Sequence, residues 1–280
     1  MREIGVNTWV WTSPLTDEAV GGLLQRIAGM GFDAVELPLE DPGHLSVGVV
    51  ADVLAQTGLK PYVVGAMAPG RDLVDASCVE ATQDYLRACI DFAAGIGAPS
   101  VCGPFYAATG RVWRMDADER AAAYDALRRN LAPVVDHSVA HGVRLGIEPL
   151  NRYETSLVNT VDQALTALEP LLGDGLGLAL DTYHLNIEER SSADAIRAAG
   201  PHLVHVQVCG SDRGAPGGDQ TDWPALVAAL DEVGYRGPLN IESFTADNAS
   251  IATAASIWRP LAPTQDDLAR DGLAFLRSLG

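Results

Sequence analysis

Short apolar runs alternate with longer amphipathic segments along the whole chain. The apolar runs predict eight β-strands, at residues 4–8, 34–38, 60–65, 100–103, 143–148, 177–181, 203–208 and 239–242. Apolar positions recur with helical spacing between them and predict helices, among others at residues 17–30, 79–95, 117–140, 161–172 and 223–233. Strands that alternate with helices indicate βαβ units and a parallel sheet.

Residues that favour helix ends support these boundaries. A glycine stands just before several of the expected strands, where it suits a left-handed helix C-terminus: Gly31, Gly58, Gly97, Gly142 and Gly234. Residues with N-capping side chains precede three of the helices: Thr16, Thr160 and Asp222.

The number of repeats distinguishes two α/β folds. Eight units in 280 residues give about 35 residues each, a period that suits a (β/α)8 TIM barrel. A doubly wound open sheet would usually carry a GxGxxG fingerprint after its first strand, and here Trp9, Val10 and Trp11 follow instead. No Pro/Ser/Gly-rich linker divides the chain. We therefore expect one (β/α)8 barrel domain over residues 1–280.

Charge and cysteine content narrow the partners and the compartment. The formal net charge is −18, which argues against nucleic acid and against an anionic membrane surface. The four cysteines show no CxxC spacing, and no apolar run reaches the length of a signal sequence or a membrane span. We expect a reduced, cytoplasmic setting.

Four consecutive strands end in polar side chains. These are Glu148, Asp181, Gln207 and Glu242, each about one βα unit apart. In a TIM barrel the carboxyl ends of the strands form the active site, so these side chains should converge at one mouth. Three converging carboxylates need a positive charge, and oxygen ligands suit Mn²⁺ or Mg²⁺, with Co²⁺ as a further option. The alternative is that each carboxylate caps a helix or pairs with an arginine.

Motifs around these positions carry a resemblance to a known family. They read EPLNRYE at 148–154, LDTYHLNIEE at 180–189, VHVQ at 204–207 followed by DRG at 212–214, and GYRG at 234–237 leading into IESF at 241–244. The chain resembles the xylose isomerase-like sugar isomerase/epimerase barrels, typified by ketose 3-epimerases that act on D-tagatose and D-psicose (D-allulose). The similarity spans essentially the whole chain and is densest over residues 143–244.

The resemblance implies a reaction and a set of roles. It implies a divalent-metal-dependent isomerase that inverts C3 of a free 2-ketose through an enediolate. The implied metal ligands are Glu148, Asp181, the strand-seven position and Glu242. Glu148 and Glu242 double as acid/base catalysts on opposite faces of the sugar. The residues that bind the carbonyl end and the neighbouring hydroxyls are Glu154, His184 and Arg213. We also expect a homodimer or homotetramer with a small-molecule sugar as its substrate.

Strand seven departs from the family pattern. The family shows His-x-His there, and the second His, six residues before the Arg, is the ligand. In this chain Gln207 holds that position before Arg213, and His205 matches the first His. We expect Gln207 to offer its amide oxygen, which tilts metal preference towards Mg²⁺ or Mn²⁺, and His205 to be a buried, hydrogen-bonded residue one layer deeper. Ligation by His205 instead remains the alternative.

Other residues near strand ends have two interpretations each. Glu36 ends the second strand and either binds substrate or orders a neighbouring group. Four aromatic residues either wall a sugar pocket or simply pack: Trp9, Trp11, Phe105 and Trp113. Residues 210–218 contain one basic residue, which favours an unphosphorylated sugar. His137 and His141, at i and i+4, are expected at the surface or an interface.

Four other functions use a similar barrel. An aldose–ketose isomerase would move a proton between C1 and C2, and a lyase acting on 3-keto-glycosides (a deglycosidase) would expel an aglycone. A non-catalytic sugar sensor is disfavoured because the whole polar set is present. A DNA-repair endonuclease is disfavoured by the charge of −18 and by the lack of a histidine-rich cluster.

Overall fold

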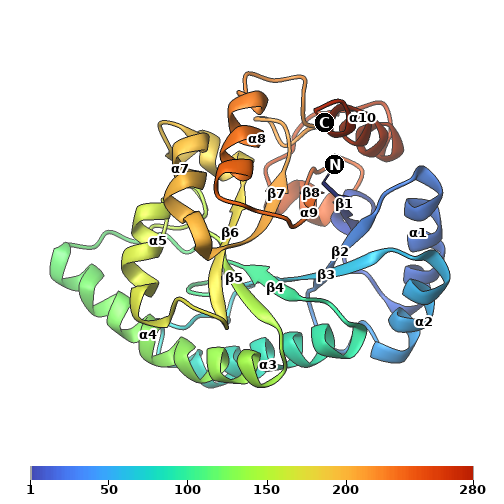
Figure 1. Cartoon of the computed structure of the whole chain (residues 1–280). Coiled ribbons are helices and arrows are strands. Elements are labelled where there is room, and N and C mark those ends of the chain that lie inside the picture. The colour runs from blue at the N-terminus through green and yellow to red at the C-terminus, as the bar shows by residue number, and fades with distance from the viewer. Residues whose placement is uncertain (1, 280) are drawn as a thin grey trace.

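Eight parallel strands close into a barrel in the computed structural model, which describes residues 2–279 (Figure 1). Each strand pairs with its neighbours in the chain, and β1 pairs with β8. The strands are β1 (Ile4–Asn7), β2 (Ala34–Leu39), β3 (Lys60–Gly65), β4 (Ser100–Gly103), β5 (Arg144–Ile147), β6 (Leu176–Asp181), β7 (Leu203–Val208) and β8 (Leu239–Ile241). The predicted TIM barrel is confirmed, and every predicted strand is present to within a residue at each end.

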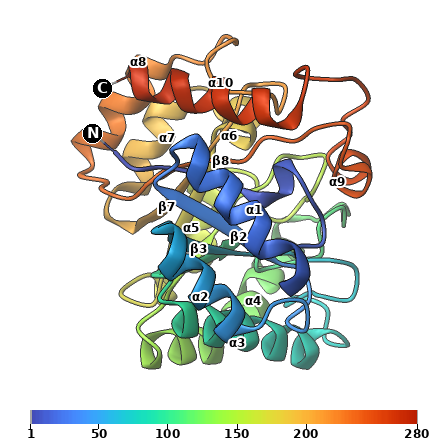
Figure 2. The same ribbon diagram turned by 90° about the vertical axis from the view of Figure 1, so that its right-hand side faces the viewer.

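Helices surround this barrel (Figure 2). They are α1 (Asp17–Met30), α2 (Val47–Thr57), α3 (Val79–Ile96), α4 (Ala117–Ala140), α5 (Val161–Leu168), α6 (Thr182–Glu188), α7 (Ser192–Ala199), α8 (Trp223–Glu232), α9 (Ala249–Ala254) and α10 (Gln265–Ser278). The last helix, α10, packs against β1 and β8 and so covers the seam of the barrel. None of the described helices is both long and apolar enough to span a membrane.

The predicted helix ends are largely confirmed. All five glycines have positive φ, between 67° and 93°. Thr160 forms a capping box with Gln163, and Asp222 accepts from the Ala225 N–H, whereas the Thr16 side chain makes no capping hydrogen bond. Helix α5 is shorter than predicted, because Pro170 lacks an N–H and the chain continues as a 3₁₀ turn (Glu169–Leu171).

An apolar core fills the space between the barrel and the helices. Helix α1 shows the pattern, because Val20, Leu24 and Ile27 are fully buried along one face. Burial of each such side chain contributes about 1.5–3 kcal/mol to the free energy of folding. This shell holds the strand ends rigidly enough to position a site.

The inside of the barrel is polar towards the carboxyl ends of the strands. The register places Asp181 beside Gln207, and Gln207 beside Asn240. Close packing here requires glycine at position 5, because a Cβ on Gly5 would lie 1.7 Å from Asn240 Oδ1. The fold therefore concentrates polar side chains in the layers that lead to the mouth.

Candidate active site

Three buried carboxylates meet at the mouth of the barrel. Glu148 follows β5, Asp181 ends β6 and Glu242 follows β8, and each residue is at most 5% exposed. The guanidinium of Arg213 lies between two of them. Its Nη1 contacts Asp181 Oδ2 and is 3.1 Å from Glu242 Oε2. The structure thus brings together the residues that the strand-end pattern predicted.

The loop after β7 holds Arg213 in a strained conformation. Its φ is +69°, in the left-handed region that few non-glycine residues adopt. The guanidinium carbon lies 4.2 Å from the ring centroid of Tyr183 and 4.8 Å from that of Phe244. The Arg213 carbonyl also accepts from the Phe244 N–H at 3.0 Å. Cation–π contacts and the ion pairs offset the backbone strain and aim the charge into the mouth.

Burial perturbs the ionisation of the carboxylates. It raises the pKa of Glu148 and of Glu242 well above the ordinary value, and it raises the pKa of Asp181. Repulsion from Asp181 adds to the effect at Glu148, while Arg213 opposes it at all three groups. A carboxyl group with a raised pKa is suited to giving and taking protons near neutral pH.

His184 is a neutral hydrogen-bond donor beside this cluster. Burial, and then the nearby Arg213 charge, lower its pKa well below the ordinary value. The Asn151 backbone N–H donates to His184 Nδ1 at 3.0 Å, which leaves the proton on Nε2. That Nε2 lies 3.4 Å from Glu148 Oε1 and 3.1 Å from Arg213 Nη2. The Asn151 side chain also donates to Glu154 Oε1 at 2.7 Å, so one asparagine orients two of the predicted sugar-binding residues.

A hydrogen-bonded network lies beneath the cluster and fixes Gln207. Gln207 Nε2 donates to Glu36 Oε2 and to Glu242 Oε1, both at 2.9 Å. Asn7 Nδ2 donates to Glu36 Oε2 at 2.6 Å, and His205 Nε2 lies 2.6 Å from Glu36 Oε1. Two facing carboxylates require the amide NH₂ on their side, so its orientation is determined. His205 is buried and hydrogen-bonded as predicted.

The donor set fits a divalent cation. Glu148 Oε1 and Gln207 Oε1 are both buried and have no hydrogen-bond partner within residues 2–279. One guanidinium leaves two of the three carboxylate charges uncompensated when all are ionised. Ligand atoms of Glu148, Asp181 and His184 lie within 4.8 Å of one another. Unpartnered oxygens and excess negative charge together suit a hard cation.

Comparison with known proteins agrees with this geometry. The sequence profile of the xylose isomerase-like TIM barrel matches residues 24–279. The chain belongs to this family.

Relatives of this xylose isomerase-like barrel are similar over their full length. The present chain is 31% identical to an L-ribulose 3-epimerase of Methylomonas sp. (strain DH-1), over 98% of this chain and 96% of the relative. It is 32% identical to a ketose 3-epimerase of Arthrobacter globiformis, over 98% and 96% of the two chains. A crystal structure of D-allulose 3-epimerase from Methylomonas sp. in complex with D-allulose superposes with a TM-score of 0.89 at 29% identity, covering 100% of this chain and 97% of that one.

Glu36 and Trp113 were also predicted to contact the substrate, and both have partners within the protein. Glu36 is fully buried, and both its oxygens are already paired with protein donors, which favours an orienting role over substrate contact. Trp113 lies in the loop after β4, where Arg111 stacks 4.3 Å from its ring. Within residues 2–279, Trp113 makes no hydrogen bond to the carboxylate cluster, and its backbone N–H donates to Ser156 Oγ at 2.9 Å. Substrate contact by Glu36 or Trp113 stays a prediction.

The other three of the four aromatic residues also have partners within the protein. Phe105 is fully buried, and its ring fills the space that a Cβ on Gly65 or Gly103 would occupy, so it belongs to the core. Trp11 hydrogen-bonds to Asp266. Trp9 packs edge-on against Phe244 at 6.4 Å, close to the ring that covers Arg213.

Sequence reasoning assigned no role to several residues that build the site. Asn7 and Asn151 orient functional groups, and Tyr183 and Phe244 make cation–π contacts with Arg213. A signal existed for each, because Asn7 ends an apolar strand run and the other three lie within the four motifs. What the sequence did not reveal is which partner each would contact.

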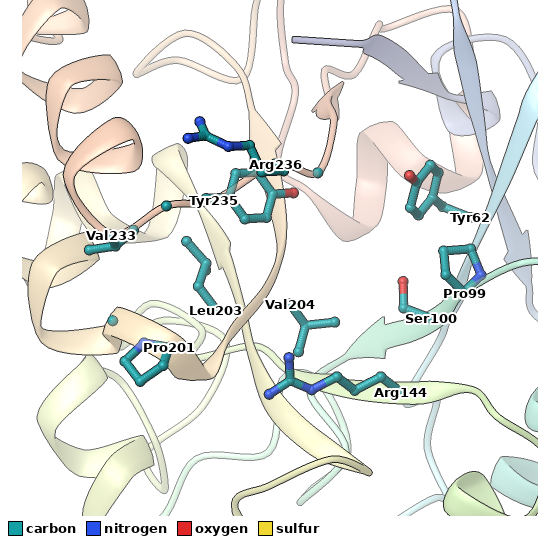
Figure 3. Close-up of a pocket in the computed structure, with 13 residues that line it drawn as sticks. Tyr62, Pro99, Ser100, Arg144, Pro201, Leu203, Val204, Val233, Tyr235 and Arg236 are labelled. Atoms are coloured by element: carbon teal, nitrogen blue, oxygen red, sulfur yellow. The ribbon is translucent and has the colours of Figure 1, made fainter.

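A separate pocket opens at the end of the barrel where the strands begin, opposite the carboxylate cluster. Its volume is about 450 Å³, and Figure 3 shows Arg144, Ser100, Tyr62 and the Tyr235–Arg236 segment around it. These residues come from strand starts and from the turn before β8. In TIM barrels the amino-terminal face serves stability, so we assign the chemistry to the other end.

Proposed function

We propose that this protein is a divalent-metal-dependent epimerase that inverts C3 of a free 2-ketose. The observation that carries the proposal is the pair Glu148 and Glu242, both buried and both with raised pKa. They follow β5 and β8, which are separated by β6 and β7 around the barrel, so they approach the mouth from different sides. The names of the relatives support sugar C3 epimerisation as well.

The two glutamates divide the proton transfer. One carboxylate removes the proton from C3 on one face of the sugar, and the other glutamate delivers a proton to the opposite face. The configuration of the substrate decides which of the two acts as the base. Because the pKa of both is raised, each is a stronger base when ionised and holds a proton more readily near neutral pH.

Arg213 and His184 stabilise the charge that develops next to C3. Arg213 Nη2 and His184 Nε2 lie 3.1 Å apart, and both are donors when His184 is neutral. Two N–H donors this close repel each other, and an acceptor that binds both would relieve the repulsion. An oxygen at C2 that gains negative charge during proton removal would accept from both. Glu154, which Asn151 holds through a hydrogen bond, would bind a neighbouring hydroxyl.

The residues that would hold the cation are Glu148, Asp181, Gln207 and Glu242. When bound, Mn²⁺ or Mg²⁺, or else Co²⁺, supplies Lewis-acid stabilisation of the oxygens next to the reacting carbon. Gln207 contributes the oxygen that its hydrogen bonds to Glu36 and Glu242 leave unpartnered.

The surroundings support a free sugar over a sugar phosphate. Arg213 is the one basic residue in the loop over residues 210–218, and its guanidinium already pairs with Asp181 and Glu242. A phosphate would find no uncommitted cation in that loop. The relatives cited above are epimerases by name, which favours epimerisation over the lyase and the aldose–ketose isomerase.

Deuterium incorporation tests the proposal. The purified protein with Mn²⁺ is incubated with D-fructose, D-allulose or L-ribulose in D₂O, and the products are followed by NMR. We expect the C3 epimer to appear with deuterium at C3. Label at C1 or C2 with aldose formation would indicate an aldose–ketose isomerase. Release of an aglycone from a 3-keto-glycoside, with no epimerisation of free ketoses, would indicate the lyase. Glu148→Gln provides the inactive control.

A further inference from the structure

A second cluster of metal-binding side chains lies on the outside of the barrel. Asp91 belongs to α3, and His137 and His141 lie on the last turn and at the C-cap of α4. The two helices lie side by side at the lower edge of the molecule (Figure 1). One ligand atom from each of the three residues lies within 4.8 Å of the others. The imidazole rings stack with centroids 4.1 Å apart.

The hydrogen bonds of His141 prepare it for a cation. Its Nδ1 lies 2.8 Å from the His137 carbonyl oxygen, which can only accept, so the proton of the neutral ring is on Nδ1. The lone pair on Nε2 then faces Asp91 Oδ1 at 3.5 Å, and both of these atoms are acceptors. An imidazole oriented through its other nitrogen is typical of metal-binding histidines. A cation between His141 and Asp91 would give His141 Nε2 a partner. It would also replace the hydrogen bond that His137 Nε2 donates to Asp91 Oδ1 at 2.6 Å, with the proton of His137 carried on Nδ1 instead.

Neither the charges nor the spacing around Asp91 oppose a cation. No arginine or lysine within residues 2–279 forms an ion pair with Asp91, and Arg87, one turn earlier on α3, pairs with Asp84 instead. The site also lies at the C-terminal end of α4, where the helix dipole favours positive charge. Metal–ligand distances of about 2.1 Å place neighbouring donor atoms roughly 3–3.5 Å apart. The His141–Asp91 pair has this spacing, and His137 Nε2, 2.6 Å from Asp91 Oδ1, reaches it when the half-exposed Asp91 side chain turns.

We propose that Asp91, His137 and His141 form a surface site for a late first-row divalent ion such as Zn²⁺, Ni²⁺ or Cu²⁺. Two imidazole nitrogens and one carboxylate select these ions over Mg²⁺, which prefers oxygen ligands. The exposure of the site leaves the remaining positions to water. Because the ligands come from two helices, the bound ion links α3 to α4 and stabilises the folded protein. This site is independent of the proposed epimerase activity.

Ni²⁺ titration by calorimetry tests the site in EDTA-treated protein kept in excess Mg²⁺. We expect His137→Ala and His141→Ala each to bind one Ni²⁺ fewer than the wild type, and Asp91→Asn to bind that ion more weakly. His202→Ala, which changes a histidine outside the cluster, should match the wild type. At a Ni²⁺ concentration one hundred times the Kd, the wild-type Tm should rise by about 4–5 °C more than that of His141→Ala.

Two results would overturn the proposal. One is an equal number of bound Ni²⁺ ions in the wild type and both alanine variants. The other is an equal rise in Tm in the wild type and His141→Ala. Epimerase activity assayed with Mn²⁺ should be the same in all these variants, so failure of the surface site and failure of the proposed function are distinguishable.

Discussion

Replacing Gln207 by leucine tests the network beneath the mouth. Leucine has nearly the same volume but removes the amide that donates to Glu36 Oε2 and to Glu242 Oε1, each at 2.9 Å. Both acceptors are buried, so water does not take the place of the lost donor. The variant therefore leaves two buried carboxylates short of a hydrogen bond while the packing is largely kept.

The expected loss follows from these two contacts. A hydrogen bond to a charged group contributes about 1.5–3 kcal/mol, so Gln207→Leu should reduce the free energy of unfolding by roughly 3–6 kcal/mol. A chain of this length has an unfolding entropy of about 0.6 kcal/mol/K, which converts the loss to a fall in Tm of about 5–10 °C.

Thermal unfolding in the presence of EDTA, monitored by circular dichroism, measures this effect without any contribution from a bound metal. A double-mutant cycle with Glu36→Gln separates the two contacts, because that background has already lost one of the charged acceptors. There the further change Gln207→Leu should lower the Tm by about half as much.

Two outcomes would refute the reasoning. A Tm for Gln207→Leu within 2 °C of the wild type would show that the amide does not stabilise the carboxylates. An equal fall in Tm in both backgrounds would show that Glu36 is not its partner.

Further predictions concern metal, catalysis and pH. EDTA should abolish epimerisation and Mn²⁺ or Mg²⁺ should restore it; full turnover in metal-stripped protein would contradict the metal assignment. Glu148→Gln and Glu242→Gln should each lower kcat by about 10³, and activity within tenfold of the wild type would remove that residue from the mechanism. Gln207→His should bind Co²⁺ and Mn²⁺ more tightly relative to Mg²⁺, because nitrogen donors favour the later metals. If Mn²⁺ titration shows that His205→Gln loses the metal, His205 and not Gln207 is the ligand. The raised pKa of Glu148 and Glu242 stabilises the metal-free protein at acid pH, and this contribution is lost as pH rises through their folded-state pKa values. The Tm gain from Mn²⁺ should therefore grow as pH rises through the folded-state pKa values of the two glutamates, and a gain that does not change with pH would contradict the pKa shifts.

The sequence predicted the barrel and the convergence of its polar residues because both follow from local patterns. Alternating strands and helices imply parallel order, and parallel order brings strand ends such as Glu148 and Glu242 to one mouth. Helices α2, α7 and α10 were not singled out. Helix α7 spans only eight residues, whereas α2 and α10 carry buried apolar positions at helical spacing and follow the same pattern as the helices that were predicted.

The contacts within the site could not be read in the same way. The bond between Glu36 and His205 joins residues 169 positions apart, across the interior of the barrel. It depends on strand stagger and on side-chain rotamers, which no periodicity encodes. The sequence placed Gln207 at the mouth, but only the structure shows its amide between Glu36 and Glu242.

The network of Asn7, Glu36, His205 and Gln207 has a consequence for directed evolution. Each polar atom that the Glu36 side chain contacts belongs to another member of the group, so a change at one position leaves the others short of a partner and lowers the stability of the fold. A library that varies the four positions together would include combinations in which a change of charge at one position is matched by a change of hydrogen-bond donor at another. The side chains of Trp9 and Trp113 make none of these hydrogen bonds, so libraries at these two positions would leave the network unchanged.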